Sequence, residues 1–274
     1  MRKSSGKSKK ERKRGDAYEL SENSKLTGLD FTYNCNLASR LYQILKSILR
    51  VACERSTYLR LQNVLYEAVR NDREHDLGSL RLGYGSVLPL KGFRYSKRVS
   101  WSNFFMNHPM VHFDEAQQQV QVQLHLAGLR KFELIHERLV KIDIKIYCVV
   151  IKLDDRNTIF YHSSKTLELR KEDHKVNRGI TFAMEDCKDA VILCLATVRC
   201  WLTTPNGREE FMSNGGTLMT GEIFDALLIR GGKHTIFPKK NQINCHRLSY
   251  QVTMMRLTGI NRLDDGFKKA AQSH

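Results

Sequence analysis

The sequence predicts an α+β fold, with an N-terminal amphipathic helical pair packed on a mainly antiparallel β-sheet and preceded by a disordered basic N-terminal arm. Apolar residues recur at helical spacing between residues 37 and 69, whereas alternation of apolar and polar residues dominates after residue 76. Helices followed by a run of strands are typical of α+β domains. The arm is predicted from a basic start that contains no apolar side chain after Met1.

The arm has a strong positive charge and nothing to bury. Residues 1–14 contain one acidic residue, Glu11, and supply +7 of the formal net charge of +16. Such a segment cannot bury enough surface to offset the entropy of ordering, so we expect it to be disordered. The cations are Arg2, Lys3, Lys7, Lys9, Lys10, Arg12, Lys13 and Arg14.

Part of this arm resembles a basic nuclear import signal, which indicates a host import receptor as a partner. The residues of that signal are Lys9, Lys10, Arg12, Lys13 and Arg14. We expect a disordered arm over residues 1–25, a single α+β body over 26–263 and a flexible C-terminal tail over 264–274.

Two helices are predicted after a short strand. The segment LDFTYNCNL alternates Leu29, Phe31 and Tyr33 with polar residues, which indicates a strand. The period then changes to that of a helix, for which Asn36 is the expected N-cap. Its apolar stripe is Leu37, Leu41, Leu45, Ile48, Leu49 and Ala52. A second helix is expected from about Tyr58 to Val69, with Ser56 or Thr57 as its N-cap.

The rest of the chain is predicted to be mainly strands. QVQVQLHLAG alternates strictly, and LVKIDIKIYCVVIKL alternates before it becomes apolar on both faces, which indicates a strand entering a buried part of a sheet. AVILCLATVRCWLTTPNGREEFM is predicted to form a hairpin, because Pro205 and the pair Asn206–Gly207 are typical of a tight turn. NGG at 214–216 and RGG at 230–232 mark turns, and HRLSYQVTMMRL is expected to be a closing strand.

The cysteines and the start of the chain bear on location. The 7 cysteines are scattered, form no C-x-x-C pair and lie mostly in apolar runs, so we expect reduced core residues of an intracellular protein. The polar stretch after the arm does not fit a signal peptide, and Arg2 directly after Met1 excludes myristoylation. The longest apolar run is far shorter than a spanning helix. Any membrane contact is therefore expected to be peripheral.

No motif with a clear catalytic chemistry is found. GGTLMTGE lacks the Lys-Ser/Thr end of a phosphate-binding loop, LIHERLV lacks the second His of a zincin, and no Ser or Cys lies in a nucleophile elbow. We therefore expect no catalytic residues, no metal site, no cofactor and no enzymatic activity.

The segment LKGFRYSKRVSW is a candidate contact surface. Cations alternate there with Phe93, Tyr95 and Trp101. In one interpretation the cations neutralise phosphates while the rings stack on bases or lie at a lipid headgroup boundary. In the other, the rings face the core and the charges face water. The candidate contacts to nucleic acid or membrane are Arg2, Lys3, Lys7, Lys91, Arg94, Lys97 and Arg98.

The layout resembles that of rhabdovirus matrix proteins. The resemblance covers residues 1–70: a Lys-rich arm, a strand, and a helix of the type SRLYQILKSILRVACER, followed by a predominantly β body. It implies a compact α+β protein that self-associates, condenses the viral nucleocapsid and its RNA, and links them to the anionic inner face of the envelope membrane during budding. Isolated prolines in place of a proline-rich late motif suit a plant-infecting member, located in the virion, the host nucleus and the cytoplasm.

A second family is also similar. CVVIKLDDR and GITFAMEDCKDAVILCLATVRCWL resemble central strands of plant-virus movement proteins of the tobamovirus type, which bind single-stranded nucleic acid and act at cell junctions. There a strand carries Leu-x-Asp-x-Arg, whereas Leu153, Asp155 and Arg156 leave no residue between the acid and the Arg. The helical pair and the basic start favour the matrix interpretation.

Deletion of residues 1–14 is predicted to weaken the salt dependence of polyanion binding. Because each phosphate contact releases counterions, the slope of log K against log salt becomes shallower when contacts are lost. The measurement is a salt titration of RNA binding by the full chain and the deletion variant. An unchanged slope and affinity would show that the arm is not the contact surface.

Overall fold

The computed structural model describes residues 20–49, 56–127, 132–173, 175–185, 187–208, 210–213 and 215–237. The arm up to residue 19, the predicted strand 246–257 and the predicted tail 264–274 lie outside the described residues. Within them the chain is mixed α+β and its strand pairs are antiparallel, so the predicted fold class is confirmed.

The two long helices precede the strands in the chain, and a short third helix lies between two of the strands. The α-helices are α1 (Glu22–Leu49), α2 (Thr57–Arg70) and the short α3 (Phe132–Ile135), and two 3-10 turns are η1 (Leu88–Leu90) and η2 (Trp101–Asn103). Ser56 occupies the N-cap position of α2 but makes no capping hydrogen bond with its side chain. The second predicted helix is thus confirmed, and its predicted side-chain cap is not observed.

The strands form two sheets. A three-stranded sheet has the order β1–β2–β6, from β1 (Met110–Asp114), β2 (Gln119–Ala127) and β6 (Lys175–Ala183). A larger sheet has the order β10–β9–β7–β3–β4, with β5 paired to β3 and β8 paired to β7. Its strands are β3 (Leu139–Lys152), β4 (Ile159–Ser163), β5 (Leu167–Arg170), β7 (Ala190–Thr203), β8 (Glu210–Met212), β9 (Met219–Arg230) and β10 (Lys233–His234).

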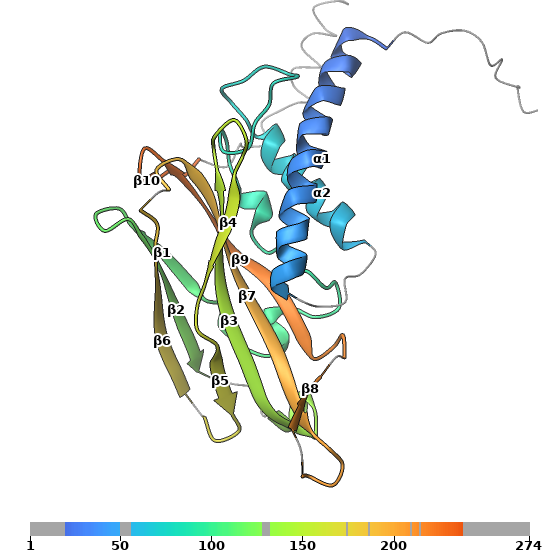
Figure 1. The fold of residues 1–274 in the computed structure, drawn as a ribbon, viewed down its shortest axis with the longest axis vertical. Helices are drawn as coiled ribbons and strands as arrows, with labels where there is room; N and C mark the ends of the chain where they lie inside the picture. The colour runs from blue at the N-terminus through green and yellow to red at the C-terminus, as the bar shows by residue number, and fades with distance from the viewer. Residues whose placement is uncertain are drawn as a thin grey trace, which may run out of the picture. The chain divides into compact units, whose positions relative to one another are not determined.

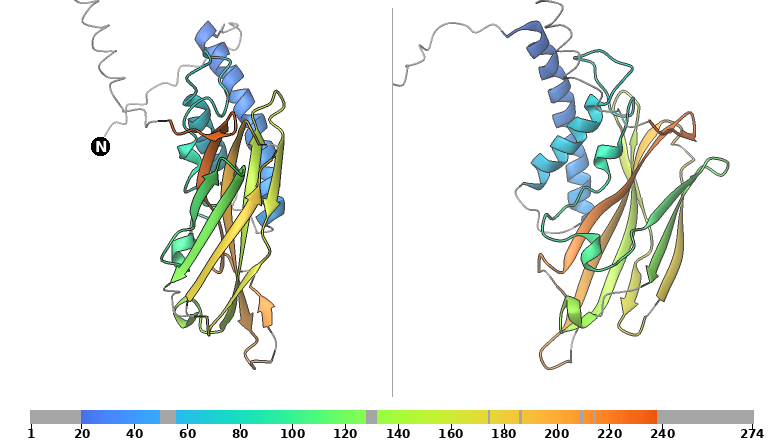
Figure 2. Two further views of the ribbon diagram at one scale, coloured as in Figure 1. Left: turned by 90° about the vertical axis from the view of Figure 1, so that its left-hand side faces the viewer. Right: turned by 180° about the vertical axis from the view of Figure 1, so that it is seen from behind.

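The small sheet packs against one face of the large sheet, and α1 and α2 lie on the other face (Figures 1 and 2). Alternate residues of β2 fill the first interface and are buried, namely Val120, Val122, Leu124 and Leu126. The predicted alternation of this strand is therefore confirmed. The hairpin of β7 and β8 is confirmed too, with Trp201 opposite Met212, and residues 231–232 form the predicted turn before β10.

The large sheet is apolar on both faces in its central part. Val149 and Ile151 of β3 and Val191 and Leu193 of β7 are fully buried, although they lie outside the core between the two sheets. They point to the helical layer, where Leu41, Leu45, Leu61 and Leu65 are buried. The layers approach so closely that a Cβ on Gly221 of β9 would lie 2.5 Å from a methyl carbon of Leu49. The predicted entry of β3 into a buried region is confirmed.

The predicted strand at residues 29–37 is wrong, because these residues lie inside α1. Residues 22–25 of the predicted arm are helical as well, and Asn36 is an exposed residue within the helix and not its N-cap. The buried stripe of α1 continues upstream of Leu37 through Asn34 and Asp30, at helical spacing. Because those two buried residues are polar, the apolar pattern does not reveal the helix.

Asp30 and Asn34 are fully buried because they bind the backbone of other segments. The Asp30 carboxylate accepts hydrogen bonds from the N–H of Gly78 (2.8 Å) and of Leu80 (2.9 Å). The Asn34 Nδ2 donates to the carbonyl of Gln62 in α2 (3.1 Å). The first half of α1 is thus fixed by polar contacts, and the second half by apolar packing.

The described cysteines fit the expectation of reduced core residues. Cys148, Cys187, Cys194 and Cys200 are buried free thiols, and Cys35 is half-buried. Burial, with a smaller contribution from the nearby Asp143 carboxylate, raises the pKa of Cys200 to about 12. The Cys200 thiol is therefore protonated at neutral pH.

Asp30→Ala is predicted to lower the free energy of unfolding by about 3 kcal/mol, because it removes two hydrogen bonds to a charged acceptor and leaves two backbone donors without it. Asp30→Asn keeps one acceptor and is expected to cost less. Ser39→Ala, at an exposed position of the same helix, is the control and is expected to change stability by less than about 0.5 kcal/mol. Urea unfolding measures all three. Equal stability of Asp30→Ala and wild type would contradict the assigned role of Asp30.

Candidate phosphate-binding groove

A groove of about 670 Å³ lies where α2 meets the segment between η1 and η2. Four of its lining side chains are cations, and none of the described residues that line it is acidic. The lining residues are Arg60, Asn63, Val64, Pro89, Lys91, Gly92, Phe93, Arg94 and Lys97. The structure thus brings three of the seven predicted contact residues, Lys91, Arg94 and Lys97, to one site.

The edge of β9 fixes the backbone of the segment LKGFRYSKRVSW, residues 90–101, which we call the basic segment. The N–H groups of Gly92 and Tyr95 donate to the carbonyls of Ile223 (2.7 Å) and Gly221 (2.8 Å), and Ile223 returns a hydrogen bond to the carbonyl of Phe93 (2.9 Å). The segment therefore pairs with part of β9 much as an extra strand would. Such pairing covers a sheet edge that would otherwise be open.

Arg60 joins α2 to the same segment. Its Nη1 donates to the carbonyl of Arg94 (2.7 Å), and its Nη2 donates to the carbonyl of Tyr95 (2.8 Å). The guanidinium also lies 5.5 Å from the ring centroid of Phe93. Arg60 is half-buried, so it fixes one wall of the groove and contributes positive charge to it.

The structure supports the second interpretation of the basic segment, in which the rings face the core and the charges face water. Phe93, Tyr95 and Trp101 are at most 7% exposed, whereas the cations Lys91, Arg94, Lys97 and Arg98 are exposed. The rings are therefore buried where bases or lipid headgroups cannot reach them. The remaining contact chemistry of this segment is charge.

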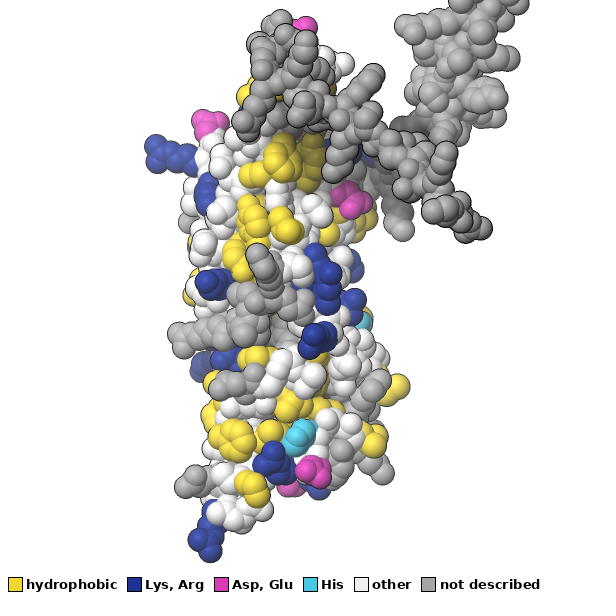
Figure 3. All heavy atoms as spheres, turned by 90° about the vertical axis from the view of Figure 1, so that its right-hand side faces the viewer, with side chains coloured by type: hydrophobic (Ala, Val, Ile, Leu, Met, Phe, Trp, Pro, Cys, Tyr) yellow, Lys and Arg dark blue, Asp and Glu magenta, His cyan; other side chains and the backbone are white. Residues whose placement is uncertain are grey.

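The charge of the groove is only partly balanced. The Lys91 ammonium lies 3.1 Å from a carboxylate oxygen of Asp225. For Arg94 and Arg98 no carboxylate of the described residues lies within 4 Å. Arg98 is exposed but does not line the groove. Figure 3, which shows the side on which the helices lie in Figure 1, has Lys and Arg side chains gathered near the middle, below apolar ones.

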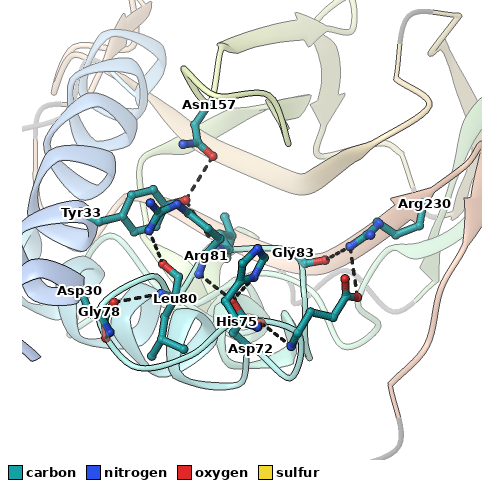
Figure 4. Close-up of polar contacts among 12 residues, drawn as sticks. Asp30, Tyr33, Asp72, His75, Gly78, Leu80, Arg81, Gly83, Asn157 and Arg230 are labelled. Atoms are coloured by element: carbon teal, nitrogen blue, oxygen red, sulfur yellow. Dashed lines mark hydrogen bonds and ion pairs between the residues drawn. The ribbon is translucent and has the colours of Figure 1, made fainter. Parts of the chain in front are cut away.

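A second polar cluster holds the loop that follows α2 (Figure 4). The buried Asp72 carboxylate accepts hydrogen bonds from the N–H groups of Glu74, His75 and Arg81, and it lies 2.9 Å from Nδ1 of His75. The Arg230 guanidinium donates to the carbonyl of Gly83 (3.1 Å). Because donors of the loop itself bind the carboxylate, this cluster fixes the conformation of the loop.

Tyr33 of α1 contacts the same loop. Its hydroxyl donates to Oδ1 of Asn157 (3.2 Å), and the Arg81 guanidinium lies 4.6 Å from its ring centroid. Burial raises the pKa of Tyr33 above its ordinary value. The hydroxyl therefore stays protonated and remains a donor over the neutral range.

Sequence reasoning missed Arg60, Asn63, Val64 and Pro89 as lining residues of the groove. Arg60 and Asn63 follow each other at helical spacing, but nothing in the sequence indicates that their face meets the basic segment. The remaining predicted contacts, Arg2, Lys3 and Lys7, and all five residues of the predicted import signal lie outside the described residues.

The described residues form neither a metal-binding cluster nor a membrane-spanning helix. In the part of the chain that the structure describes, no group of three or more His, Cys, Asp or Glu residues is placed to hold a metal ion. Among the helices of that part, none is long and apolar enough to cross a bilayer.

Comparison with protein-family models gives no match for this chain, and comparison with curated proteins gives none either.

The charge-neutralising variant Lys91→Gln/Arg94→Gln/Lys97→Gln is predicted to reduce the slope of log K against log salt by about 2 to 3 for binding to a nucleic acid duplex, because each lost phosphate contact removes nearly one unit. A salt titration of binding measures it. The matched control is Lys165→Gln/Lys171→Gln/Lys233→Gln, which removes equal charge at exposed positions outside the groove. Equal slopes for the two variants would contradict the assignment of the groove.

Proposed function

We propose that this chain is a non-enzymatic viral matrix protein, of the type found in plant-infecting rhabdoviruses. In this role it self-associates, condenses the ribonucleoprotein and links it to the inner face of the envelope membrane during assembly and budding. The observation that carries the proposal is the groove, which gathers the cations Arg60, Lys91, Arg94 and Lys97 on one surface. Phosphates of RNA and of anionic lipids are the ligands that such a surface takes.

Apolar side chains beside the groove support the membrane part of the proposal. Leu59 precedes Arg60 in α2 and is 58% exposed, and Leu88 precedes Pro89 and is 40% exposed. Cations together with exposed leucines are typical of surfaces that bind peripherally at an anionic headgroup layer. The basic arm adds charge to either contact, and its import signal would give the protein access to the host nucleus.

A second candidate function is that of a plant-virus movement protein that binds single-stranded nucleic acid. One observation favours it. Tyr147, Tyr161 and Trp201 line one cavity on the large sheet together with cations. Rings and cations on an open sheet surface are typical of single-strand binding.

The functions are separated by flotation of vesicles with labelled RNA. A matrix protein is predicted to carry RNA to the top of a density gradient with vesicles containing phosphatidylserine, and not with neutral phosphatidylcholine vesicles. The Lys91→Gln/Arg94→Gln/Lys97→Gln variant is expected to lose most of this transfer, and the Lys165/Lys171/Lys233 control to retain it. Strong single-strand binding without flotation or self-association would contradict the matrix proposal and favour the movement protein.

A further inference from the structure

A second cavity, of about 420 Å³, lies on the helix-covered face of the large sheet, at the end of α1. Its size is in the range of small-molecule sites, roughly 300–1,000 Å³. The helix contributes Ser47 and Ile48. The sheet contributes Asp143, Lys145, Tyr147, Tyr161, Ser163, Thr166, Thr197, Arg199, Trp201 and Met212.

The cavity occupies the part of the sheet where β3 still alternates. Ile142, Ile144 and Ile146 are buried between the two sheets, so Asp143, Lys145 and Tyr147 point to the opposite face. In the pairing of β3 with β7, Asp143 lies opposite Arg199 and Lys145 lies opposite Thr197. The side chains that β3 presents to the helical layer are therefore polar or aromatic at this point.

Two cations of the cavity have no carboxylate partner among the residues that the structure describes. No carboxylate of the described residues lies within 4 Å of the Lys145 ammonium or the Arg199 guanidinium. Arg199 is held in place by Nη2, which donates to the carbonyl of Leu49 (2.7 Å), and Nη1 lies 3.7 Å from the sulfur of Met212. A guanidinium held in this way and an ammonium that line the same cavity suit a phosphate.

Among the described residues that line the cavity, Asp143 is the one carboxylate, and one of its oxygens is hydrogen-bonded. Asp143 Oδ2 accepts a hydrogen bond from the Trp201 indole N–H (2.6 Å), and Oδ1 lies 3.7 Å from the Lys141 ammonium. The same ammonium lies 4.2 Å from the Trp201 ring centroid. The Lys141 ammonium also lies 3.6 Å from Oε1 of Glu168, so it is shared between two carboxylates. With Lys145 and Arg199 against Asp143, the described lining still carries a net positive charge.

Three aromatic rings lie beside these cations. The Lys145 ammonium is 5.4 Å from the ring centroid of Tyr147, and Tyr147 and Tyr161 contact each other with centroids 6.1 Å apart. Tyr161 is 46% exposed, and Trp201 is half-buried. Unlike the rings of the basic segment, Tyr161 and Trp201 are therefore open to a ligand, whereas Tyr147 is buried behind them at 7% exposure. Aromatic faces of this kind take nucleobases by stacking.

We propose that this cavity binds a nucleotide, with the phosphate on Lys145 and Arg199 and the base against Tyr161 and Trp201. The inference goes beyond the proposed function, because the groove takes phosphates alone whereas this cavity selects a phosphate attached to an aromatic base. The nucleotide is either free or one unit of a single strand. A double helix does not fit, because its bases are stacked and paired and cannot enter the cavity.

Tryptophan fluorescence reports on this site. The chain has 2 tryptophans, of which Trp101 is 1% exposed, while Trp201 lines the cavity. Adenosine monophosphate and a single-stranded RNA of about ten nucleotides, each titrated into the full chain, are expected to quench the emission. Lys145→Gln is expected to weaken the affinity about tenfold, the loss expected for one hydrogen bond to a charged group. Lys145→Gln/Arg199→Gln is expected to weaken it further.

Lys152→Gln is the matched control, because Lys152 lies on the same strand with its ammonium 5.6 Å from the Phe160 ring but does not line the cavity. It is expected to keep the wild-type affinity, and so is the Lys91/Arg94/Lys97 groove variant with adenosine monophosphate. If the groove variant behaves like the wild type in the salt titration and in flotation, while adenosine monophosphate still quenches the tryptophan emission, the proposed function alone is overturned. Circular dichroism of the Lys145→Gln variant verifies that it is folded.

Equal affinities for the two probes would assign the site to free nucleotides, and much tighter binding of the RNA would assign it to single strands. Either result supports the proposal. Three results would overturn it: no quenching by either probe, displacement of adenosine monophosphate by inorganic phosphate or anionic vesicles at equal concentration, or unchanged affinity of the folded Lys145→Gln variant.

Discussion

The structure depends on one constraint, namely that the central strands of the large sheet are apolar on both faces. Residues 148–151 of β3 and 190–196 of β7 are buried on both sides. Because exposed apolar surface costs about 25 cal/mol per Å², a single partner sheet is not sufficient, and the helical layer is required on the second face. Leu49 against Gly221 shows how closely that layer packs.

Both candidate binding surfaces follow from the extent of this helical layer. Along β9, α2 and the basic segment meet and leave a groove whose buried rings fix the backbone while the cations remain in water. On β3, the two-sided apolar run begins at Cys148. The alternating residues before it lie at the end of α1, where a polar and aromatic cavity remains. Apolar burial thus leaves the charged side chains at these two surfaces, because the core itself cannot contain them.

The sequence predicted those features that local periodicity determines. The strict alternation around Val122 and the change of pattern at Cys148 both correspond to observed burial. The start of α1 could not be predicted, because Asp30 and Asn34 are buried through hydrogen bonds to segments far along the chain. The groove was predicted only in part. The contribution of Arg60 depends on how α2 packs on the basic segment, and the burial of Phe93 depends on its pairing with Ile223.

Hydrogen–deuterium exchange of the full chain, with and without a single-stranded RNA, tests the central claim most directly, because it locates both surfaces in one experiment. The account predicts slower exchange in two places. One is residues 91–98 of the basic segment, and the other is the part of the large sheet that lines the cavity, residues 141–147 of β3 and 197–201 of β7. Hydrogen exchange in β1 and β6, the edge strands of the three-stranded sheet, is predicted to be unchanged. Protection confined to β1 and β6, or no change in the basic segment and the two strand ends, would contradict the account.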